Sequence, residues 1–129
     1  MKDLRVLLYV ESRFKVNRKR VRAVVSRVIG DQHIEGPVEV SISFVGNRKM
    51  KEISDRHLND GKIHNILSFP FAEGEASVMP SDALHLGDII ISYPILIQEA
   101  SEEEELVDDR VDMLVEHGLL HLLGIHHPV

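Results

Sequence analysis

Three histidines near the carboxyl end follow a spacing that constrains both the last helix and the chemistry it can carry. His117 and His121 are four residues apart, which on an α-helix places them on one face, about 6 Å apart along the axis. Neutral imidazole is the commonest protein ligand for zinc-like ions, so one ion can reach both rings. Gly124 is placed to end the helix in a left-handed cap, after which the chain can bring back His127, or His126, as a third ligand. Three protein ligands leave a fourth position for water, which is the arrangement of catalytic sites.

Four leucines surround this histidine pair, so the helix that carries it is expected to be buried. They are Leu119, Leu120, Leu122 and Leu123. A polar group that is buried without a hydrogen bond is costly, so histidines in such a helix need either a metal ion or polar partners. Two interpretations therefore follow from these residues alone: a metal site, or a hydrogen-bonded pair of core histidines.

The composition suits one domain that covers residues 1–129 and is long enough to bury a core. Hydrophobic residues make up 43% of the chain, yet no apolar run approaches the roughly 20 residues that span a bilayer. Residues 1–11 are strand-like and lack the basic region and cleavage site of a signal peptide. The chain has no cysteine, which excludes disulfides and thiolate ligands. We therefore expect a cytoplasmic protein with no membrane association, whose metal ligands are nitrogen and oxygen atoms.

Charge is distributed unevenly along the chain. The formal net charge of −6 argues against a uniformly basic nucleic-acid binder. Seven of the 15 basic residues nevertheless fall between Arg13 and Arg27, and no acid occurs between Ser12 and Gly30. This basic segment is typical of a phosphate-binding surface, and equally of a solvated helix face. Acidic residues gather late in the chain, at Glu102, Glu103, Glu104, Glu105, Asp108 and Asp109.

Four segments have the patterns of β-strands. Residues 4–10 form a first apolar run, and residues 38–44 alternate between hydrophobic and polar side chains, which indicates a strand with one buried face. Residues 86–92 are almost continuously apolar, as expected for a buried strand. Residues 63–69 are predicted to be extended and to end at Pro70.

Helical periodicity fills the intervals between the strands. Asn17 and Gly30 are predicted to begin and end a first helix, and a second is predicted from Asn47 as its cap to about His57. A third follows from Pro94, a residue tolerated in the first turn. The inward face of the second helix is predicted to carry Met50, Ile53 and Leu58.

A capping box at Ser101 and Glu104 predicts a last helix from about Glu102 to Leu123, whose acidic first turns suit the helix dipole. Residues 72–83 are predicted to form a surface loop. The resulting order, β-α-β-α-β-β-α-α, predicts an α+β fold. We expect a small mixed sheet of about four strands packed with helices, with the metal-binding helix at the C-terminus.

Residues 65–70, residues 86–92 and the closing run from His117 to His127 resemble, in the same order, three segments of the YbeY family of bacterial metal-dependent endoribonucleases. Residues 65–70, Asn-Ile-Leu-Ser-Phe-Pro, are similar to its Asp/Asn-Val-Leu-Ser-Phe-Pro segment, and residues 86–92 to its Leu-Gly-Asp-Ile-x-Ile-Ser strand. Leu58 and Asn59 fit the family's Leu-Asn. The closing motif, His-Gly-x-Leu-His-Leu-x-Gly-Tyr-Asp-His, is matched at His117, Gly118, Leu120, His121, Leu122, Gly124 and His127.

The resemblance implies a hydrolase that cleaves single-stranded RNA during ribosomal RNA maturation. It implies one zinc-like divalent ion per chain, held by His117, His121 and His127, and a metal-activated water that hydrolyses the phosphodiester. The implied partner is RNA, as ribosomal RNA or the small ribosomal subunit, and no DNA is expected. The basic segment supplies the candidate RNA contacts, Arg13, Lys15, Arg18, Lys19, Arg20 and Arg22.

The chain departs from the family pattern at two places. Ile125 and His126 replace the motif's Tyr-Asp, and we expect His126 to be a neighbour of the site or a surface residue, not a ligand. The turn between Asn59 and Asn65 is shorter than in the family and lacks its arginine. Cleavage of a phosphodiester needs charge stabilisation around phosphorus, and Lys62 is our candidate to supply it.

Two other functions are compatible with parts of the sequence. A non-catalytic RNA-binding or ribosome-associated module would use the basic segment without hydrolysis. A zinc metalloprotease also places two histidines four apart, but its motif is His-Glu-x-x-His, with the glutamate as general base. Here Gly118 follows His117, and Glu116 lies about 100° away around the helix.

Overall fold

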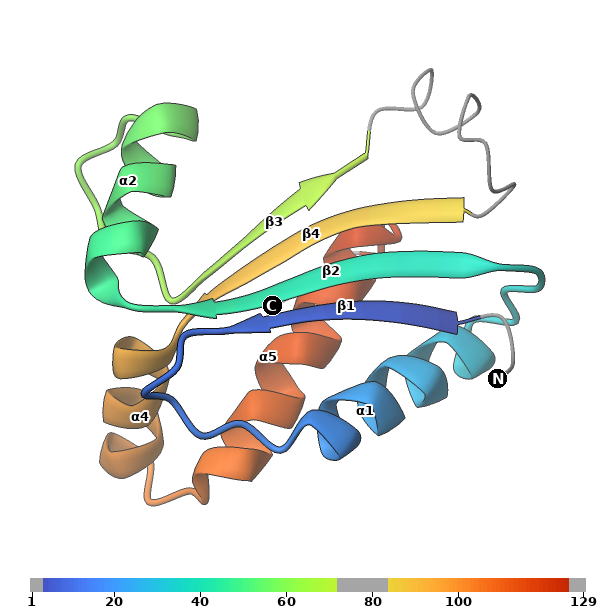
Figure 1. The fold of residues 1–129 in the computed structure, drawn as a ribbon, viewed down its shortest axis with the longest axis horizontal. Coiled ribbons are helices and arrows are strands. Elements are labelled where there is room, and N and C mark those ends of the chain that lie inside the picture. Colours follow the sequence, from blue (N-terminus) through green and yellow to red (C-terminus); the bar gives the residue numbers. More distant parts are fainter. Residues whose placement is uncertain (1–3, 72–83, 126–129) are drawn as a thin grey trace.

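The computed structural model describes residues 4–71 and 84–125, and Figure 1 shows the course of the chain. Over these ranges the elements follow the predicted order. The strands are β1 (Leu4–Val10), β2 (Val38–Val45), β3 (Ile66–Pro70) and β4 (Leu84–Ser92). The helices are α1 (Arg18–Asp31), α2 (Asn47–His57), α4 (Tyr93–Glu102) and α5 (Val107–Leu122). The predicted loop at 72–83 lies outside the described residues.

The strands form a four-stranded sheet in the order β1-β2-β4-β3. β1 and β4 both pair with β2 in parallel, and β3 pairs with β4 in the antiparallel direction. β1 and β3 are therefore the two edge strands of this sheet. Pro70 ends β3 and has no N–H to donate, which an edge strand tolerates. The predicted α+β class, with a mixed sheet of about four strands, is confirmed.

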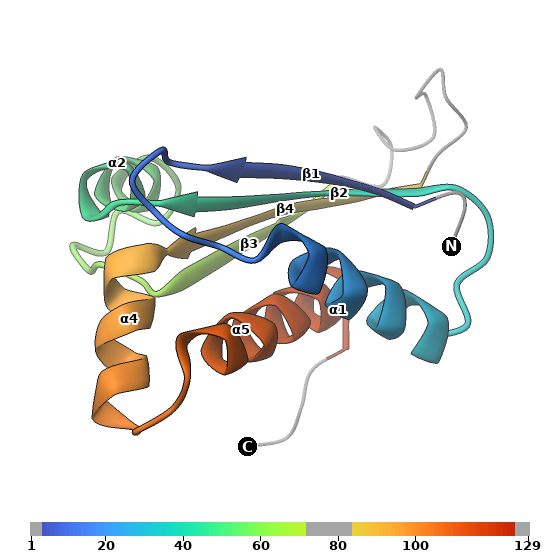
Figure 2. The same cartoon turned by 60° about the horizontal axis from the view of Figure 1, so that its bottom comes forward.

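One face of the sheet carries the main core. Side chains along β1 and β2 alternate in exposure, as the period of two requires. α1 and α5 lie across the more buried face, and α4 stands at the end where β4 finishes (Figure 2). Fully buried side chains in this core include Val25, Ile42, Phe44, Ile89 and Leu119.

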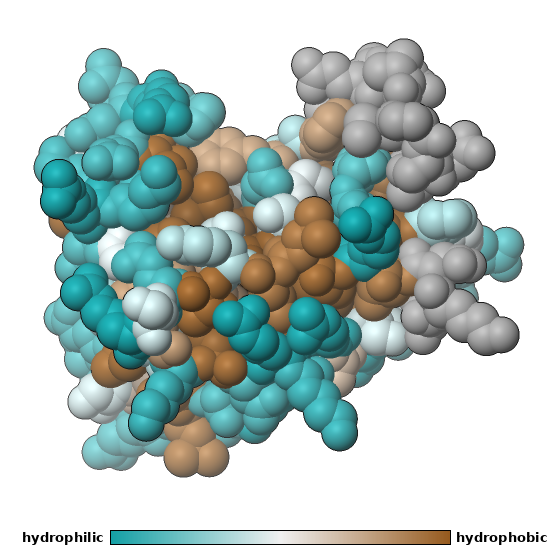
Figure 3. Space-filling model, viewed as in Figure 1, coloured by the Kyte–Doolittle hydropathy of each residue, from teal (hydrophilic) through white to brown (hydrophobic). Residues whose placement is uncertain are grey.

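The opposite face of the sheet is covered by α2 at one end. There Met50 packs with Val45 and Leu67 in a second, smaller cluster. Away from α2, apolar residues gather over the strands and are visible between polar margins (Figure 3). Leu7 of β1, for example, is 45% exposed. The alternation predicted for residues 38–44 is thus confirmed, with a packed face and a partly open one.

The nearly continuous apolar run of β4 does not reflect equal burial on both faces. Its pairing with β2 shifts by one residue beside Gly87, which adopts φ +134°. A Cβ at Gly87 would collide with the carbonyl oxygen of Phe69, so glycine is required at this bulge. The bulge lets Leu86 and Ile89 both join the main core, while Ile90 packs with the α2 cluster.

The first two helices lie close to their predicted bounds. Asn17 caps α1 by accepting a hydrogen bond from a first-turn backbone N–H at 3.0 Å, although the helix continues one residue past Gly30. The prediction that Asn47 caps α2 was wrong, because the cap is Gly46. The Asn47 side chain instead accepts a hydrogen bond from Ser92 Oγ at 3.1 Å.

The prediction of one last helix from Glu102 was also wrong. α4 runs to Glu102, and after a turn α5 begins at Val107 with Leu106 as its cap. Leucine offers no side-chain oxygen, so Ser101 and Glu104 form no capping box with α5. Of the acidic run, only the two aspartates directly after Val107 lie in the first turn of α5.

Two further observations complete the description of the elements. Leu58, predicted to face inward from α2, is 47% exposed, because the helix ends at His57. Among the described residues, no helix combines the length and the apolar character needed to cross a bilayer.

Candidate metal site and nucleic-acid contacts

A glycine brings α5 unusually close to the sheet. A Cβ at Gly118 would lie 3.0 Å from Ile89 Cγ2 and 3.2 Å from Ile66 Cδ1. Both isoleucines belong to the antiparallel β3–β4 pair. α5 therefore packs directly on these two strands, and the residues on either side of Gly118 along its edge are held beside β3.

The predicted pair, His117 and His121, faces a groove between α5 and β3. The groove has a volume of about 230 Å³ and is lined by Ile66, Leu67, Ser68 and the two histidines. Both histidines are exposed, whereas Leu119 and Leu122 of the same helix are buried. The interpretation of the pair as buried core histidines was therefore wrong. Their rings stand where solvent and a ligand can reach them.

The end of α5 follows the prediction from Gly124. Gly124 adopts φ +78°, and the N–H of Ile125 donates back to the carbonyl of Leu120 at 2.8 Å. This is the left-handed helix ending for which glycine is favoured. His126 and His127 lie outside the described residues, so the third ligand stays a prediction.

The donors that are described fit part of a zinc-like site. His117 and His121 offer two imidazoles on adjacent turns of one helix, and imidazole nitrogen suits such an ion. Within residues 4–71 and 84–125, no three His, Cys, Asp or Glu side chains converge as a metal site. The third ligand that the motif predicts, His127, lies outside these ranges.

Lys62 does not line this groove. It follows a tight turn in which Asn59 and Gly61 both have positive φ. Asp60 accepts hydrogen bonds from the Lys62 backbone N–H at 3.0 Å and from the His64 ring at 2.8 Å. These two hydrogen bonds lower the pKa of Asp60. The short turn is thus closed by its own side chains, and the Lys62 ammonium is left exposed.

The basic segment divides into two groups in the structure. Arg20 contacts the acids of α5, with Nε 2.8 Å from Asp112 Oδ2 and Nη2 2.6 Å from Asp109 Oδ1. Arg27 pairs with Glu116 of the same helix at 2.8 Å. The late acidic run and the early basic run therefore meet within the molecule. These contacts join segments 89 and 92 residues apart in the chain, so neither run predicts them by itself.

The other candidate RNA contacts have no ion pair within the described part of the chain. They are Arg13, Lys15, Arg18, Lys19 and Arg22, all of them exposed. Lys19 and Arg22 line a cavity of about 300 Å³ between α1 and β1, together with Leu4 and Val6. β1 and β3 are opposite edges of the sheet, about 14 Å apart at ~4.8 Å per strand. An RNA that contacts both the basic residues beside β1 and the groove beside β3 must therefore be longer than one nucleotide.

A polar cluster next to the groove was not predicted. Asn65, directly before β3, donates from Nδ2 to the carboxylate of Glu99 at 3.3 Å. Arg110 of α5 donates to Glu99 Oε1 at 3.1 Å and to Glu105 Oε1 at 2.8 Å. This cluster joins the start of β3 to α4 and α5, so it positions the strand that forms one wall of the groove.

Most of the chain is similar to a family of known proteins. The family model described as "Endoribonuclease YbeY" matches residues 9–129. A protein named Endoribonuclease YbeY from Thermodesulfovibrio yellowstonii is 38% identical over 90 residues, which is 70% of this chain and 54% of that protein. The protein of the same name from Francisella philomiragia is 36% identical over 102 residues, covering 78% of this chain and 63% of the relative.

A solved structure shows the same fold. The solution structure of a protein from Thermotoga maritima superposes with a TM-score of 0.61 and 20% identity, covering 97% of this chain and 75% of the other. The matched region of this chain spans between half and two thirds of the length of the curated relatives above.

Proposed function

Because this chain belongs to the YbeY endoribonuclease family, we propose that it is a metal-dependent endoribonuclease that cleaves single-stranded RNA in ribosomal RNA maturation. The observation that supports this most directly is the exposed pair His117 and His121 at an open groove between α5 and β3. The relatives carry the name of the same activity. By the same family membership, we propose ribosomal RNA as the substrate and the small ribosomal subunit as the partner.

His117, His121 and His127 would hold one zinc-like divalent ion. Such an ion supplies a water whose pKa is lowered to about 7 and an electrophile for a phosphoryl oxygen. The chain's own contribution is to fix the two described imidazoles on adjacent turns of a helix pressed against the sheet. Ser68 adds a hydroxyl to the β3 wall of the groove, where a phosphodiester would lie. Lys62, which does not line the groove, remains the proposed cation that stabilises negative charge on the phosphate.

The proposed RNA contacts are Arg13, Lys15, Arg18, Lys19 and Arg22. Their exposed side chains lack ion pairs in the described ranges, so their charge is available to phosphate. We leave out Arg20, because its guanidinium is engaged by Asp109 and Asp112 of α5.

The structure also weighs against the metalloprotease alternative. A protease of this kind needs a glutamate beside the metal as general base. Glu116 is the acid next to His117, and its carboxylate is bound by Arg27 at 2.8 Å. The non-catalytic RNA-binding module is the remaining alternative, and it is favoured by the shortened turn that lacks the family's arginine.

Cleavage and metal content of the same preparations test the proposal. Protein purified without chelator should contain about one equivalent of a transition metal and cut a single-stranded oligoribonucleotide, and chelation should stop the cut. His121→Ala should lose both the metal and the activity. His33→Asn is the matched control, because His33 is exposed and has φ +55°, which asparagine tolerates.

Three other outcomes of this experiment would each contradict a different part of the proposal. A full metal equivalent in His121→Ala would remove His121 from the site. Tight RNA binding without cleavage by the metal-loaded protein would favour the non-catalytic module. Cleavage that survives chelation would contradict the metal-dependent mechanism.

A further inference from the structure

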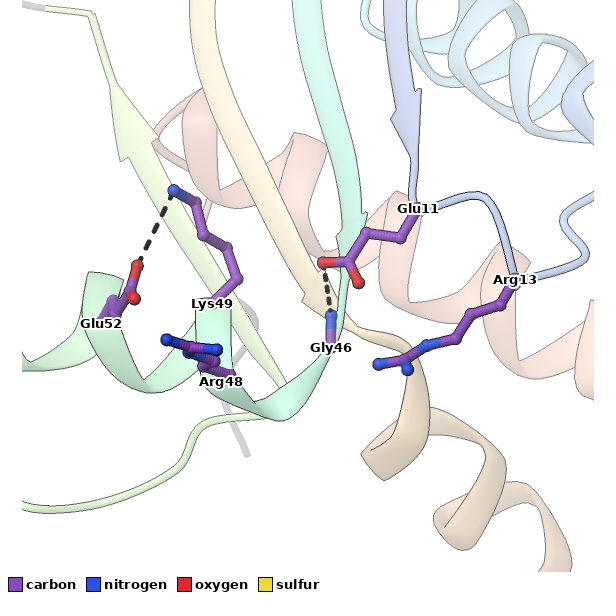
Figure 4. A pocket seen from close by; sticks show the side chains of 6 residues that line it. All are labelled: Glu11, Arg13, Gly46, Arg48, Lys49 and Glu52. Carbon is purple, nitrogen blue, oxygen red and sulfur yellow. Dashed lines mark hydrogen bonds and ion pairs between the residues drawn. The ribbon is translucent and has the colours of Figure 1, made fainter.

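A pocket rich in cations lies at the ends of β1 and β2, away from the histidine groove. It has a volume of about 200 Å³ and shares no lining residue with that groove. Its lining is Glu11, Arg13, Gly46, Arg48, Lys49 and Glu52. Figure 4 shows Arg13 extending toward Gly46 from the β1–α1 connection, with Arg48 in the first turn of α2 on the other side of Gly46. The pocket lies beyond the carboxyl ends of two parallel strands, a common place for ligands in open sheets.

The segment that carries Arg13 is held in place by several contacts. Glu11 Oε2 accepts a hydrogen bond from the Gly46 N–H at 2.9 Å. Phe14 stacks on Tyr93 with ring centroids 4.7 Å apart, and the Tyr93 hydroxyl donates to the carbonyl of Lys15 at 2.6 Å. A guanidinium presented from such a segment loses less conformational entropy on binding than one on a loose loop.

Gly46 also sets how close Arg13 comes to α2. A Cβ at Gly46 would lie 3.2 Å from Arg13 Nη2 and 3.4 Å from Glu11 Oε1. Because Gly46 has no side chain, the Arg13 guanidinium has room beside the N-terminus of α2. The Arg13 guanidinium carbon lies over the Phe14 ring, 5.3 Å from its centroid, which is within the range of a cation–π interaction.

The charge of this pocket is poorly balanced inside the chain. Arg13 and Arg48 make no ion pair within the described residues, and Lys49 lies 3.9 Å from Glu52 with both side chains more than half exposed. Cations in the first turn of a helix are unfavourable to its dipole, and α2 has no acid there. Arg48 and Lys49 therefore destabilise the first turn of α2, and a bound anion would offset this effect.

We propose that this pocket binds one backbone phosphate of single-stranded RNA through Arg13 and Arg48, at a nucleotide distinct from the one at the histidine groove. Guanidinium groups match phosphate oxygens in bidentate geometry, and Lys49 adds a third positive charge at the rim. The lining also holds the carboxylates of Glu11 and Glu52, but its three cations exceed these two acids. This inference rests on the proposed endoribonuclease function, because RNA is the polyanion assigned to the chain.

The test measures the affinity of a fluorescent single-stranded oligoribonucleotide over a range of KCl concentrations. For single strands, the slope of log K against log salt changes by about 0.7 for each phosphate contact. The double variant R13Q/R48Q should lower the magnitude of the slope by about 0.7 and weaken binding at low salt. Arg56→Gln is the matched control, because Arg56 is an exposed arginine in the last turn of the same helix.

The outcomes separate this inference from the proposed function. If wild-type protein binds the RNA and R13Q/R48Q keeps the wild-type slope, the pocket holds no phosphate and the inference is overturned. A slope that falls equally in Arg56→Gln would show a general charge effect and would also overturn it. If wild-type protein neither binds nor cuts RNA, the proposed function fails instead. Circular dichroism and thermal unfolding of each variant establish that the fold is intact.

Discussion

α1 and α5 cover the same face of the sheet but meet it in different ways. Each carries one glycine inside the helix. At Gly118 of α5, an added Cβ would come within 3.0 Å of Ile89, whereas at Gly30 of α1 it would meet nothing within 4 Å. α5 is therefore in close contact with the strands at Gly118, whereas Gly30 is exposed near the end of α1, a helix that contributes buried valines to the same core and ion pairs to α5.

The difference between the helices separates two roles. Close packing gives α5 a fixed position, which a site built from His117 and His121 needs, since ligand geometry tolerates little movement. α1 turns part of its basic surface toward the acids of α5 and leaves the rest exposed. The charge pattern of the sequence thus mixes structural ion pairs with exposed cations that form no ion pair within the described residues.

The largest expected effect comes from filling the space at the two glycines. Gly118→Ala should lower the free energy of unfolding by about 1–3 kcal/mol, because the methyl group would overpack against Ile89 and Ile66. It should also reduce metal affinity by shifting α5 against β3. Gly30→Ala, the matched control, should be neutral or stabilise by up to about 1 kcal/mol. Urea unfolding measures both, and equal effects would show that Gly118 is not a point of close contact between α5 and the strands.

Tyr93 holds the segment that precedes α1, and its substitution tests how much this contact contributes to stability. Tyr93→Phe removes the hydrogen bond from the hydroxyl to the carbonyl of Lys15 and should cost about 0.5–1.5 kcal/mol at neutral pH. Tyr9, the other tyrosine of the chain, is 58% exposed, so Tyr9→Phe is the control and should be neutral.

The alkaline range gives a second readout of Tyr93. Burial raises the pKa of Tyr93 above its ordinary value of about 10. Below that value both folded and unfolded states keep the proton, so this group adds no pH dependence. As the pH rises past about 10, the unfolded state releases its proton first, and stability falls. Tyr93→Phe should remove this loss in urea unfolding between pH 9 and about 11, and an unchanged alkaline decline would assign it to another group.

Local sequence patterns predicted an element correctly where a short-range interaction alone determines where it begins, ends or is buried. The alternation of residues 38–44 predicted β2, Asn17 predicted the start of α1, and Gly124 predicted the turn that ends α5. In each case the deciding interaction lies within a few residues of the chain. The histidine spacing also predicted that both rings share one side of α5, and the groove they line agrees with that.

Other features depend on contacts between distant segments and could not be predicted locally. The capping box at Ser101 does not form because Glu104 leaves the helical conformation with φ +55°, while Arg110 of α5 pairs with Glu99 of α4 and with Glu105 of the connection. The burial of the two histidines was overestimated, because Leu119 and Leu122 enter the core while the histidines line the groove. No local rule shows that Gly87 sits at a bulge against Phe69, or that Arg20 reaches Asp112, 92 residues away.

The smallest expected effect tests whether Arg20 belongs to the interface with α5 or to the RNA surface. Hydrogen bonds to Asp112 and Asp109 raise the pKa of Arg20 and hold its charge between the two helices. Arg20→Gln should lower the unfolding temperature by less than Gly118→Ala does, and the difference should shrink in high salt, which screens such pairs. Its RNA-binding salt slope should match that of wild type, because Arg20 has no charge to spare for phosphate. Arg18→Gln is the matched comparison two residues away, and should flatten the slope by about 0.7 without lowering the unfolding temperature. If Arg20→Gln weakens RNA binding as much as Arg18→Gln, the basic face of α1 acts as one surface, and its division into structural and binding residues is wrong.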